Sequence, residues 1–497
     1  MKNNIKILRI IITLILLFLL GYFLSQKINL VTTDLGRHLE NGQLILAGEN
    51  FQELLHTNFY SYTEPDFPFV NHHWGSGVVF YLIQQIIGFS GLSIFYLILA
   101  LGSFALVFFL TKKSANFWLA ILFSFLLLPL MAERKEIRPE IFSLFFSALF
   151  LFILWSWKNG KIFFKWLWVL PLCMIFWVNL HVYFILGFLI LGLFLLEIFL
   201  QEYKRKKYLQ TKKILQISGI ALLVSLINPF GIKILLFPFQ IFENYGYSVL
   251  ENQSIFFVKD YGLNNPNYNL ALLIAFLALI ISLLGIYKNK NQNLALNLLG
   301  IFLAVWSVLA IRNFAFLGVL ALPLLAINFK NIFWRKEKIV RHDVLGISCM
   351  LIFIFGCYFN WQFLKFHSQN KGFGLKPANL SAVQFFKDNT LKGPIFNNYD
   401  VGGYLIYSLF SQEKVFVDNR PEAYSVDFFQ KTYIPMQENE DIWQEELQKY
   451  GFQTIFFSRT DITPWARNFL KNRLSDSEWR IAYQDQYAII FRRQHAD

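Results

Sequence analysis

Three side chains capable of acid–base chemistry stand within five positions, directly after the first apolar stretch of the chain. The segment "VTTDLGRHLENGQLILAG" (residues 31–48) carries Asp34, Arg37 and His38. A carboxylate there can act as general base on a hydroxyl or amine, and we predict this role for Asp34. A histidine can orient substrate, shuttle a proton or bind a metal, and we predict a catalytic role in orientation for His38. Arg37 is predicted to bind an anion.

Other polar residues stand in short connections between apolar stretches. Arginine holds phosphate bidentately, so a phosphate-bearing substrate would explain them. As the alternative, each residue caps a helix or extends to the membrane interface. That alternative suits any single residue, whereas the whole set favours one shared cavity. We therefore predict substrate or phosphate binding by His72 and His73 in "NHHW", Arg134 and Arg138 in "ERKEIRPE", Asn179 and His181 in "WVNLH", and Arg312 in "IRN".

Two carboxylates in the same segments, Glu133 and Glu136, are candidate ligands for a divalent cation. The sequence has no clear paired-carboxylate motif, so a metal-independent reaction is favoured and metal dependence is left open. The three cysteines, Cys173, Cys349 and Cys357, stand in apolar segments, which argues against a disulfide framework or a zinc site.

The composition is that of a polytopic membrane protein. The chain has 497 residues, of which 56% are hydrophobic and only 15% charged. Many windows hold about 20 mainly apolar residues, the length that a helix needs to cross the bilayer. The net charge of +13 fits basic cytoplasmic loops better than a nucleic-acid partner, so we expect no nucleic acid.

We predict about eleven spans, at residues 6–25, 91–110, 117–131, 139–157, 166–180, 182–200, 214–228, 269–287, 292–311, 314–328 and 343–361. Basic residues fall on alternate connections, including "YKRKK" and "WRKEKIVR", which predicts a cytoplasmic N-terminus. An odd number of spans then places the C-terminal part outside. We expect a multi-pass protein of the bacterial inner membrane, with a membrane domain over residues 1–362 and an extracytoplasmic domain over 370–497.

Two regions depart from the pattern of spanning helices. The first outer loop, 26–90, contains a predicted amphipathic helix at its start and the segment "WGSGVVFYLIQQIIG", which is predicted to lie at the membrane interface. The C-terminal region has strand-like runs among helical ones, which predicts a small α/β domain. The strand-like runs are "GPIFN", "KVFVDN", "QTIFFS" and "YAIIFRR", and "ENEDIWQEELQKYG" is helical.

Two motifs of the C-terminal domain combine glycine or charged residues with strand-like runs. Gly402 and Gly403 in "DVGGYL" are predicted to form a strand-to-helix turn that needs glycine's backbone freedom. For Asp418, Arg420 and Glu422 in "VDNRPEAY", the sequence leaves two roles open: contact with an acceptor or the membrane cavity, and support of the fold.

The large first outer loop, with an acidic residue shortly after span one, resembles the GT-C superfamily of membrane glycosyltransferases. The resemblance implies that an aspartate or glutamate early in this loop is catalytic and that polyprenyl-phosphate sugars are the donors. Asp34 is the matching position, although it lacks the second acidic residue of a DxD or DE signature. Segments such as "TTDLGRHLENGQLIL", "IRPEIFSLFF" and "NNYDVGGYLIYSLFSQEKVFVDNRPEAY" also resemble a group of bacterial membrane proteins that are described only as glycosyltransferase-like.

The sequence therefore predicts a mainly α, polytopic GT-C-like bundle with a C-terminal α/β domain. The predicted function is sugar transfer from a polyprenyl-phosphate-linked donor to an extracytoplasmic glycan, lipid or protein acceptor. A non-catalytic protein on the same scaffold, binding glycans or lipid-linked sugars or serving as an assembly factor, is the alternative. A transporter is disfavoured, because the sequence has no internal repeat and no charged residues deep within the spans.

Overall fold

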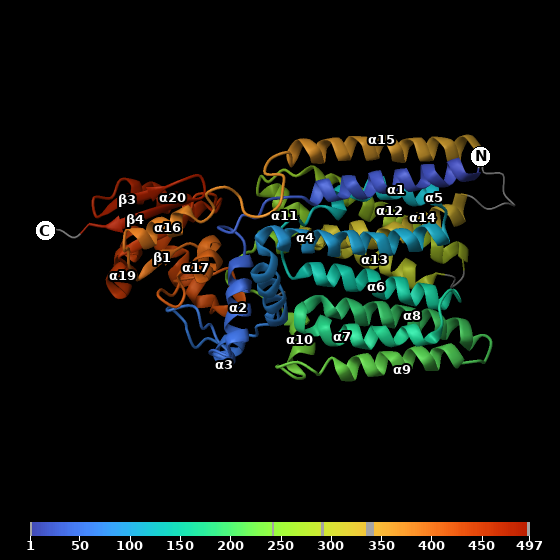
Figure 1. Ribbon diagram of the computed structural model, residues 1–497, viewed down its shortest axis with the longest axis horizontal. Helices are drawn as coiled ribbons and strands as arrows, with labels where there is room; N and C mark the ends of the chain where they lie inside the picture. Colours follow the sequence, from blue (N-terminus) through green and yellow to red (C-terminus); the bar gives the residue numbers. More distant parts are fainter. Residues whose placement is uncertain (1, 241–242, 290–292, 334–341, 495–497) are drawn as a thin grey trace.

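The computed structural model describes residues 2–240, 243–289, 293–333 and 342–494. The basic segment "WRKEKIVR" and Lys290, which entered the prediction of topology, lie outside the described residues. In Figure 1 the long helices form a bundle on one side of the molecule, and the C-terminal domain lies beyond one end of it. We call this end of the bundle the domain end. The N-terminus lies at the opposite end.

Each of the eleven predicted apolar segments contains a helix of the bundle. Seven helices among the described residues are long and apolar enough to cross a membrane, and the number of spans stays a prediction. The mainly helical, multi-pass architecture is confirmed. The bundle helices are α1 (Lys2–Leu24), α4 (Trp74–Ser114), α5 (Phe117–Met131), α6 (Glu140–Lys158), α7 (Val169–Leu180), α8 (Ile185–Tyr203), α9 (Leu209–Val224), α12 (Pro266–Asn289), α13 (Leu294–Leu309), α14 (Phe314–Phe333) and α15 (His342–Phe366).

Burial differs between the centre and the edge of the bundle. In the most apolar window of the α14 segment 83% of the residues are buried, against 22% in α1 and in α15. A helix that is apolar all round and exposed suits a lipid environment, whereas α14 forms the protein core. The helices α1 and α15 therefore form an edge of the bundle, as Figure 1 shows.

The first outer loop is folded and holds three helical pieces: α2 (Leu35–Ala47), α3 (Phe51–His56) and the start of α4. At Gly88 the backbone of α4 leaves the helical region with φ +68°, a conformation that glycine adopts readily. Residues 74–87 therefore form a helix distinct from the span that follows. Its Ile86 and Ile87 are exposed, as an interfacial segment requires.

Helix α2 is held tightly between the bundle and the C-terminal domain. A methyl group added at Gly42 would collide with the Gly77 carbonyl of α4, and one added at Gly36 would collide with the Gly403 carbonyl of α17 (Gly402–Leu409). Because the backbones approach this closely on two faces, the start of α2, which carries Arg37 and His38, is fixed in position.

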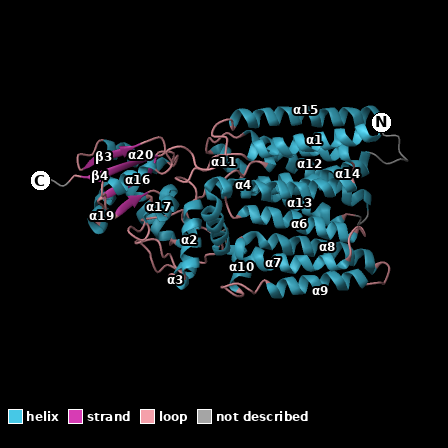
Figure 2. Ribbon diagram, viewed as in Figure 1, coloured by secondary structure: helices cyan, strands magenta, loops and turns pink. Residues whose placement is uncertain are grey.

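The C-terminal domain has a mixed four-stranded sheet in the order β1-β2-β4-β3, and all strands of the described chain lie here (Figure 2). Strands β1 and β2 are parallel, whereas β4 is antiparallel to both β2 and β3. This confirms the predicted α/β character. The strands are β1 (Ile395–Asn397), β2 (Thr454–Ser458), β3 (Trp479–Gln484) and β4 (Ala488–Arg493); the helices are α16 (Ser381–Asp388), α17, α18 (Pro435–Glu438), α19 (Glu440–Tyr450) and α20 (Pro464–Leu474).

Two expectations for this domain were wrong. The run "KVFVDN" is no strand of the sheet; within it Val415 forms an isolated bridge with Ser61 of the first outer loop. Gly402 has an ordinary helical backbone, with φ −55°, so it is not needed for conformational freedom. It is needed for space, because a side chain there would collide with the backbone of Asp418.

Candidate active site

A cavity of about 420 Å³ opens between the domain end of the bundle, the first outer loop and the C-terminal domain. We call it the first cavity. The predicted site residues come from connections far apart in the chain, and the fold brings most of them to this one place. Those that line the cavity are Asp34, Arg37, His72, His73, Arg138, His181 and Arg312.

Asp34 precedes α2 and is surrounded by nitrogen atoms at distances slightly longer than hydrogen bonds. Its Oδ1 lies 3.7 Å from Arg138 Nε, and its Oδ2 lies 3.5 Å from His38 Nε2 and 3.9 Å from Arg37 Nη2. Burial alone would raise the pKa of Asp34, but Arg138, His38 and Arg37 outweigh burial and hold the pKa well below its usual range. Asp34 is therefore ionised, and its Oδ1 has no hydrogen-bond partner among the described residues.

His38 lies fully buried beneath Asp34. Burial, with the nearby charge of Arg37, lowers the pKa of His38 to about 4 although Asp34 opposes the shift. His38 Nε2 faces two groups: Arg37 Nη2, which can only donate, at 3.4 Å, and Asp34 Oδ2 at 3.5 Å. His38 therefore links Arg37 and the Asp34 carboxylate from one side.

The other histidines continue from His38 as a series of ring contacts. His73 lies 5.4 Å from His38, 3.8 Å from His72 and 5.2 Å from His181, measured between ring centroids. The rings pack against one another, whereas metal ligands converge on a point. In the described parts of the chain no three His, Cys, Asp or Glu side chains form a group that could hold a metal ion. The described residues thus do not fit a divalent cation, and no step proposed below uses one.

Burial of these histidines makes stability depend on pH. Burial lowers the pKa of His72 to about 3 and that of His38 to about 4, from 6.5. Between pH 6.5 and 4 the unfolded chain therefore binds protons that the folded chain does not, so stability falls as the pH falls. Each such histidine contributes up to about 1.4 kcal/mol per pH unit. The thermal midpoint of the detergent-solubilised chain should drop between pH 7 and pH 5.

The matched test replaces single histidines with glutamine. His38→Gln should make the midpoint less sensitive to pH, whereas His56→Gln, at an exposed position of α3, should leave the sensitivity unchanged. If His38→Gln and the unmodified chain show the same slope, the folded chain does not keep His38 neutral.

The arginines at the domain end are paired with buried or half-buried glutamates. Arg134 contacts Glu140 at 2.6 Å and Glu251 at 2.9 Å, and Arg138 contacts Glu251 at 2.6 Å. Burial alone would raise the pKa of Glu251, but the positive charges of Arg134, Arg138 and Arg312 have the larger effect. They lower the pKa and keep the carboxylate ionised. Arg134 and Arg138 are thus held in position by carboxylates from α6 and from the connection between α10 (Lys233–Gln240) and α11 (Ile255–Asp260).

Two arginines that line the first cavity keep unused donors. The Nε atoms of Arg37 and Arg312 are buried and have no hydrogen-bond partner among the described residues. Arg312 Nη1 donates to Asn252 at 2.7 Å, and its Nε lies 3.5 Å from Glu140. Both guanidinium groups line the first cavity, so an anion inside it would meet donors that no carboxylate fully occupies.

Four residues of the predicted set lie elsewhere. Arg134 and Glu136 line a second cavity of about 380 Å³, together with Glu133, which accepts hydrogen bonds from Asn265 and Asn267. Asn179 accepts from Trp74 Nε1 at 3.1 Å, and its own amide donates to the Ile175 and Ile227 carbonyls, so it fixes the start of α4 against α7.

One further part of the lining of the first cavity was not found by sequence reasoning, except for Glu422. It is acidic and aromatic: Tyr247 stacks on Tyr399 with ring centroids 4.3 Å apart, and Asp400 and Asp461 lie on the same wall. Burial, and to a smaller extent the negative charge of Asp461, raises the pKa of Asp400 to about 7. Tyr247 and Glu251 belong to a connection without a recognisable motif, so only long-range folding reveals them.

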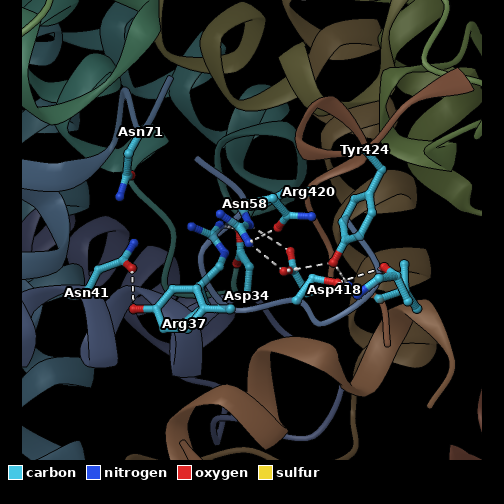
Figure 3. Close-up of polar contacts among 12 residues, drawn as sticks. Asp34, Arg37, Asn41, Asn58, Asn71, Asp418, Arg420 and Tyr424 are labelled. Carbon is cyan, nitrogen blue, oxygen red and sulfur yellow. Dashed lines mark hydrogen bonds and ion pairs between the residues drawn. The ribbon is translucent and has the colours of Figure 1, made fainter. Parts of the chain in front are cut away.

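A buried ion pair of the C-terminal domain, Asp418 with Arg420, lies beside Asp34 and Arg37 and is linked to the first outer loop through Asn58 (Figure 3). Arg420 donates from Nε and Nη2 to the two carboxylate oxygens of Asp418, at 2.7 and 2.6 Å, and from Nη2 to Asn58 at 2.8 Å. Tyr424 adds a hydroxyl contact to Asp418 at 3.2 Å. Asp418 and Arg420 thus support the junction, while Glu422 faces the cavity.

Comparison with solved structures supports the class of this fold. AglB, the archaeal oligosaccharyltransferase of Archaeoglobus fulgidus, in complex with an inhibitory peptide and a dolichol-phosphate, matches with a TM-score of 0.65 and 10% identity, over 99% of this chain and 75% of that one. ArnT from Cupriavidus metallidurans bound to undecaprenyl phosphate matches with a TM-score of 0.53 and 10% identity, over 99% and 98% of the two chains. No protein-family model and no curated protein matches the sequence.

The predicted GT-C-like fold is confirmed, because the chain shares its fold with the oligosaccharyltransferase AglB and with ArnT. The chain is a multi-pass protein with the GT-C architecture. An identity of 10–13% establishes the fold alone, so the reaction must be argued from the site.

Proposed function

We propose that this protein is an integral-membrane glycosyltransferase that moves a sugar from a polyprenyl-phosphate-linked donor to an acceptor. The observation that carries the proposal is the ionised Asp34, whose Oδ1 lacks a hydrogen-bond partner and which lines the same cavity as the unused donors of Arg37 and Arg312. A transferase of this kind needs an acceptor for the nucleophile's proton and donors for the phosphate that leaves.

In the proposed reaction the acceptor's hydroxyl or amine donates a hydrogen bond to Asp34 Oδ1. A lone pair of the acceptor's oxygen or nitrogen attacks the anomeric carbon of the donor sugar, and the bond from that carbon to the phosphate oxygen breaks. The proton passes to Asp34 as positive charge builds on the attacking atom. A strongly ionised carboxylate is a weak base toward a neutral hydroxyl, so its first role is orientation and proton removal comes late. His38 keeps the carboxylate in place from below.

The leaving phosphate is proposed to lie against Arg37 and Arg312. The ligands bound in two structural neighbours, dolichol-phosphate in AglB and undecaprenyl phosphate in ArnT, support this class of donor for the present chain. The acidic and aromatic wall with Tyr247, Asp400 and Glu422 would then face the sugar or the acceptor. Aromatic faces and carboxylates are suited to carbohydrate, because they bind its C–H faces and its hydroxyl groups.

Arginine-to-lysine substitution tests the phosphate site. Arg312→Lys keeps the charge but loses the planar fork, so retention of undecaprenyl phosphate by the purified chain should fall about tenfold. Native mass spectrometry at increasing lipid concentration measures this. Arg37→Lys should behave in the same way.

The matched control is Arg467→Lys, at an exposed position of α20, which should retain the lipid like the unmodified chain. Unchanged retention in both Arg37→Lys and Arg312→Lys would show that neither side chain holds the phosphate.

We also propose that the C-terminal domain is extracytoplasmic. Lysines close helices at the opposite end of the bundle, for example Lys112 and Lys113 in α4 and Lys158 in α6, as expected of a cytoplasmic face. Alkaline phosphatase fused after residue 497 should be active, and a reporter inserted at Lys206 should report a cytoplasmic location. The reverse result for either reporter would refute this orientation.

A further inference from the structure

The second cavity lies at the domain end of the bundle, beside the first cavity. The two share Arg138 and Glu251, whose ion pair stands between them, but Asp34 and the histidines of the first cavity do not line the second. Its wall is formed by the residues that follow α1, by the turn between α5 and α6, and by the linker that follows α15. The second cavity therefore has lining and chemistry of its own.

Three lysines belong to this lining. Lys27, Lys135 and Lys376 all face the second cavity, and none of them takes part in an ion pair found among the described residues. The arginines beside them are already neutralised by Glu251, Glu140 and Glu136. The ammonium of Lys135 lies over an aromatic face, 4.7 Å from the Phe363 ring centroid.

Basic side chains therefore outnumber acidic ones in this lining, where Lys27, Lys135, Lys376, Arg134 and Arg138 meet Glu133, Glu136 and Glu251. Burial lowers the pKa of Lys135 to about 7, with Glu133 opposing the shift and Lys371 adding to it. An anion in the cavity would remove that penalty. Under the proposed orientation these lysines also lie on the face where basic residues are normally rare, so a specific reason for them is needed.

An apolar groove lies between the same three helices, α1, α5 and α15, which run side by side at the edge of the bundle (Figure 1). It encloses about 420 Å³ and is lined from α1 by Ile12, Ile15, Leu16 and Leu19. Trp118, Phe125 and Phe353 supply much of the rest. Leu19 is five residues from the end of α1 at Leu24, about 8 Å along the helix, so the groove lies below the lysines within the bilayer.

We propose that this edge of the protein binds an anionic glycerophospholipid, whose phosphate lies among Lys27, Lys135 and Lys376 and whose acyl chain lies in the groove between α1, α5 and α15. Lysine ammonium groups and a phosphodiester are complementary in charge, and the groove offers the chain a protein surface at the correct depth. The lipid is distinct from the sugar donor, because the proposed base does not line this cavity.

The bound lipid would also stabilise the connection between bundle and C-terminal domain. Lys376 belongs to the linker that follows α15, and the backbone of this linker pairs with the segment after α1: Lys376 N donates to the Ile28 carbonyl at 2.9 Å, and Ile28 N to the Gly374 carbonyl at 2.8 Å. A phosphate between Lys27 and Lys376 would join these two segments a second time.

Native mass spectrometry of the full chain, released from nanodiscs of phosphatidylcholine with added phosphatidylglycerol, tests the head-group site. The unmodified chain should retain one phosphatidylglycerol. The triple variant Lys27→Gln, Lys135→Gln, Lys376→Gln should bind it about tenfold to a hundredfold more weakly. The control with the same loss of charge is Lys387→Gln, Lys392→Gln, Lys471→Gln, at exposed positions of the C-terminal domain, and it should bind phosphatidylglycerol normally.

The groove is tested separately by filling it. Ile15→Trp should weaken phosphatidylglycerol retention although all three lysines are present, whereas Leu222→Trp, at an exposed position of α9, should not. The proposal is overturned if the triple lysine variant retains phosphatidylglycerol as well as its control does. It is also overturned if the triple lysine variant keeps phosphatidylglycerol and loses undecaprenyl phosphate. The outcome is independent of the proposed reaction, because Asp34→Asn should abolish transfer and still retain phosphatidylglycerol.

Discussion

Replacing Asp34 with asparagine should lower the rate of sugar transfer by about a hundredfold to ten-thousandfold, the usual cost of losing a positioned base. Asparagine keeps the size of the side chain but cannot accept a proton. Arg37 and Arg138 lie 3.7–3.9 Å from this carboxylate and lower its pKa, so the loss of charge should also cost some stability, and the thermal midpoint of the variant is measured beside the rate. The measurement is the initial rate of product formation in membranes of a deletion strain that expresses each variant at the native level.

His38 provides the matched comparison, because it contacts the same carboxylate without facing the acceptor. His38→Gln should lower the rate less than Asp34→Asn does, since glutamine can still donate a hydrogen bond. Both variants should retain undecaprenyl phosphate. Full activity of Asp34→Asn would show that Asp34 is not the base. A non-catalytic binding protein would then be the better interpretation.

Replacing Asp418 with asparagine should destabilise the junction between the first outer loop and the C-terminal domain by about 3–5 kcal/mol. The reason is that Arg420, with 3% of its surface exposed, would lose both bonds to a carboxylate and stay buried with its charge. Thermal unfolding of the detergent-solubilised chain should show a clearly lower midpoint, and limited proteolysis should cut the first outer loop sooner.

The control for Asp418 is an exposed pair in the same domain. Asp427 contacts Lys431 at 2.7 Å, with both side chains well exposed, so Asp427→Asn should cost at most about 1 kcal/mol. Equal midpoints for the Asp418 and Asp427 variants would mean that the buried pair does not hold the junction together.

The bundle could be predicted from the sequence because each span needs only a local property, an apolar stretch of sufficient length. The break at Gly88 was also anticipated, since residues 74–88 are too short to span. The C-terminal domain was harder, because its core depends on contacts between distant residues. The buried run "KVFVDN" has the composition of a strand but pairs through Val415 with the first outer loop, and the strand Trp479–Gln484 was missed.

In the site, the residues that could be predicted from the sequence are ionisable side chains next to apolar segments. Asp34, Arg312 and the histidines stand out against an apolar background. Glu251 does not, because its connection carries other polar and acidic residues, and its role is evident only when it meets Arg134 and Arg138. Tyr247 likewise belongs to the site only because it stacks on Tyr399, about 150 residues further along the chain.

The central claim is that this protein transfers a sugar by means of Asp34. The most direct test is mass spectrometry of cell-envelope glycans and lipids from three strains: one with the unmodified gene, one with the gene deleted, and one with Asp34→Asn at the native level. The account predicts that one glycosylated product disappears from both the deletion and the Asp34→Asn strain, while the unused polyprenyl-phosphate sugar accumulates in both. An Asp34→Asn strain with the same glycosylated product as the unmodified strain would contradict it.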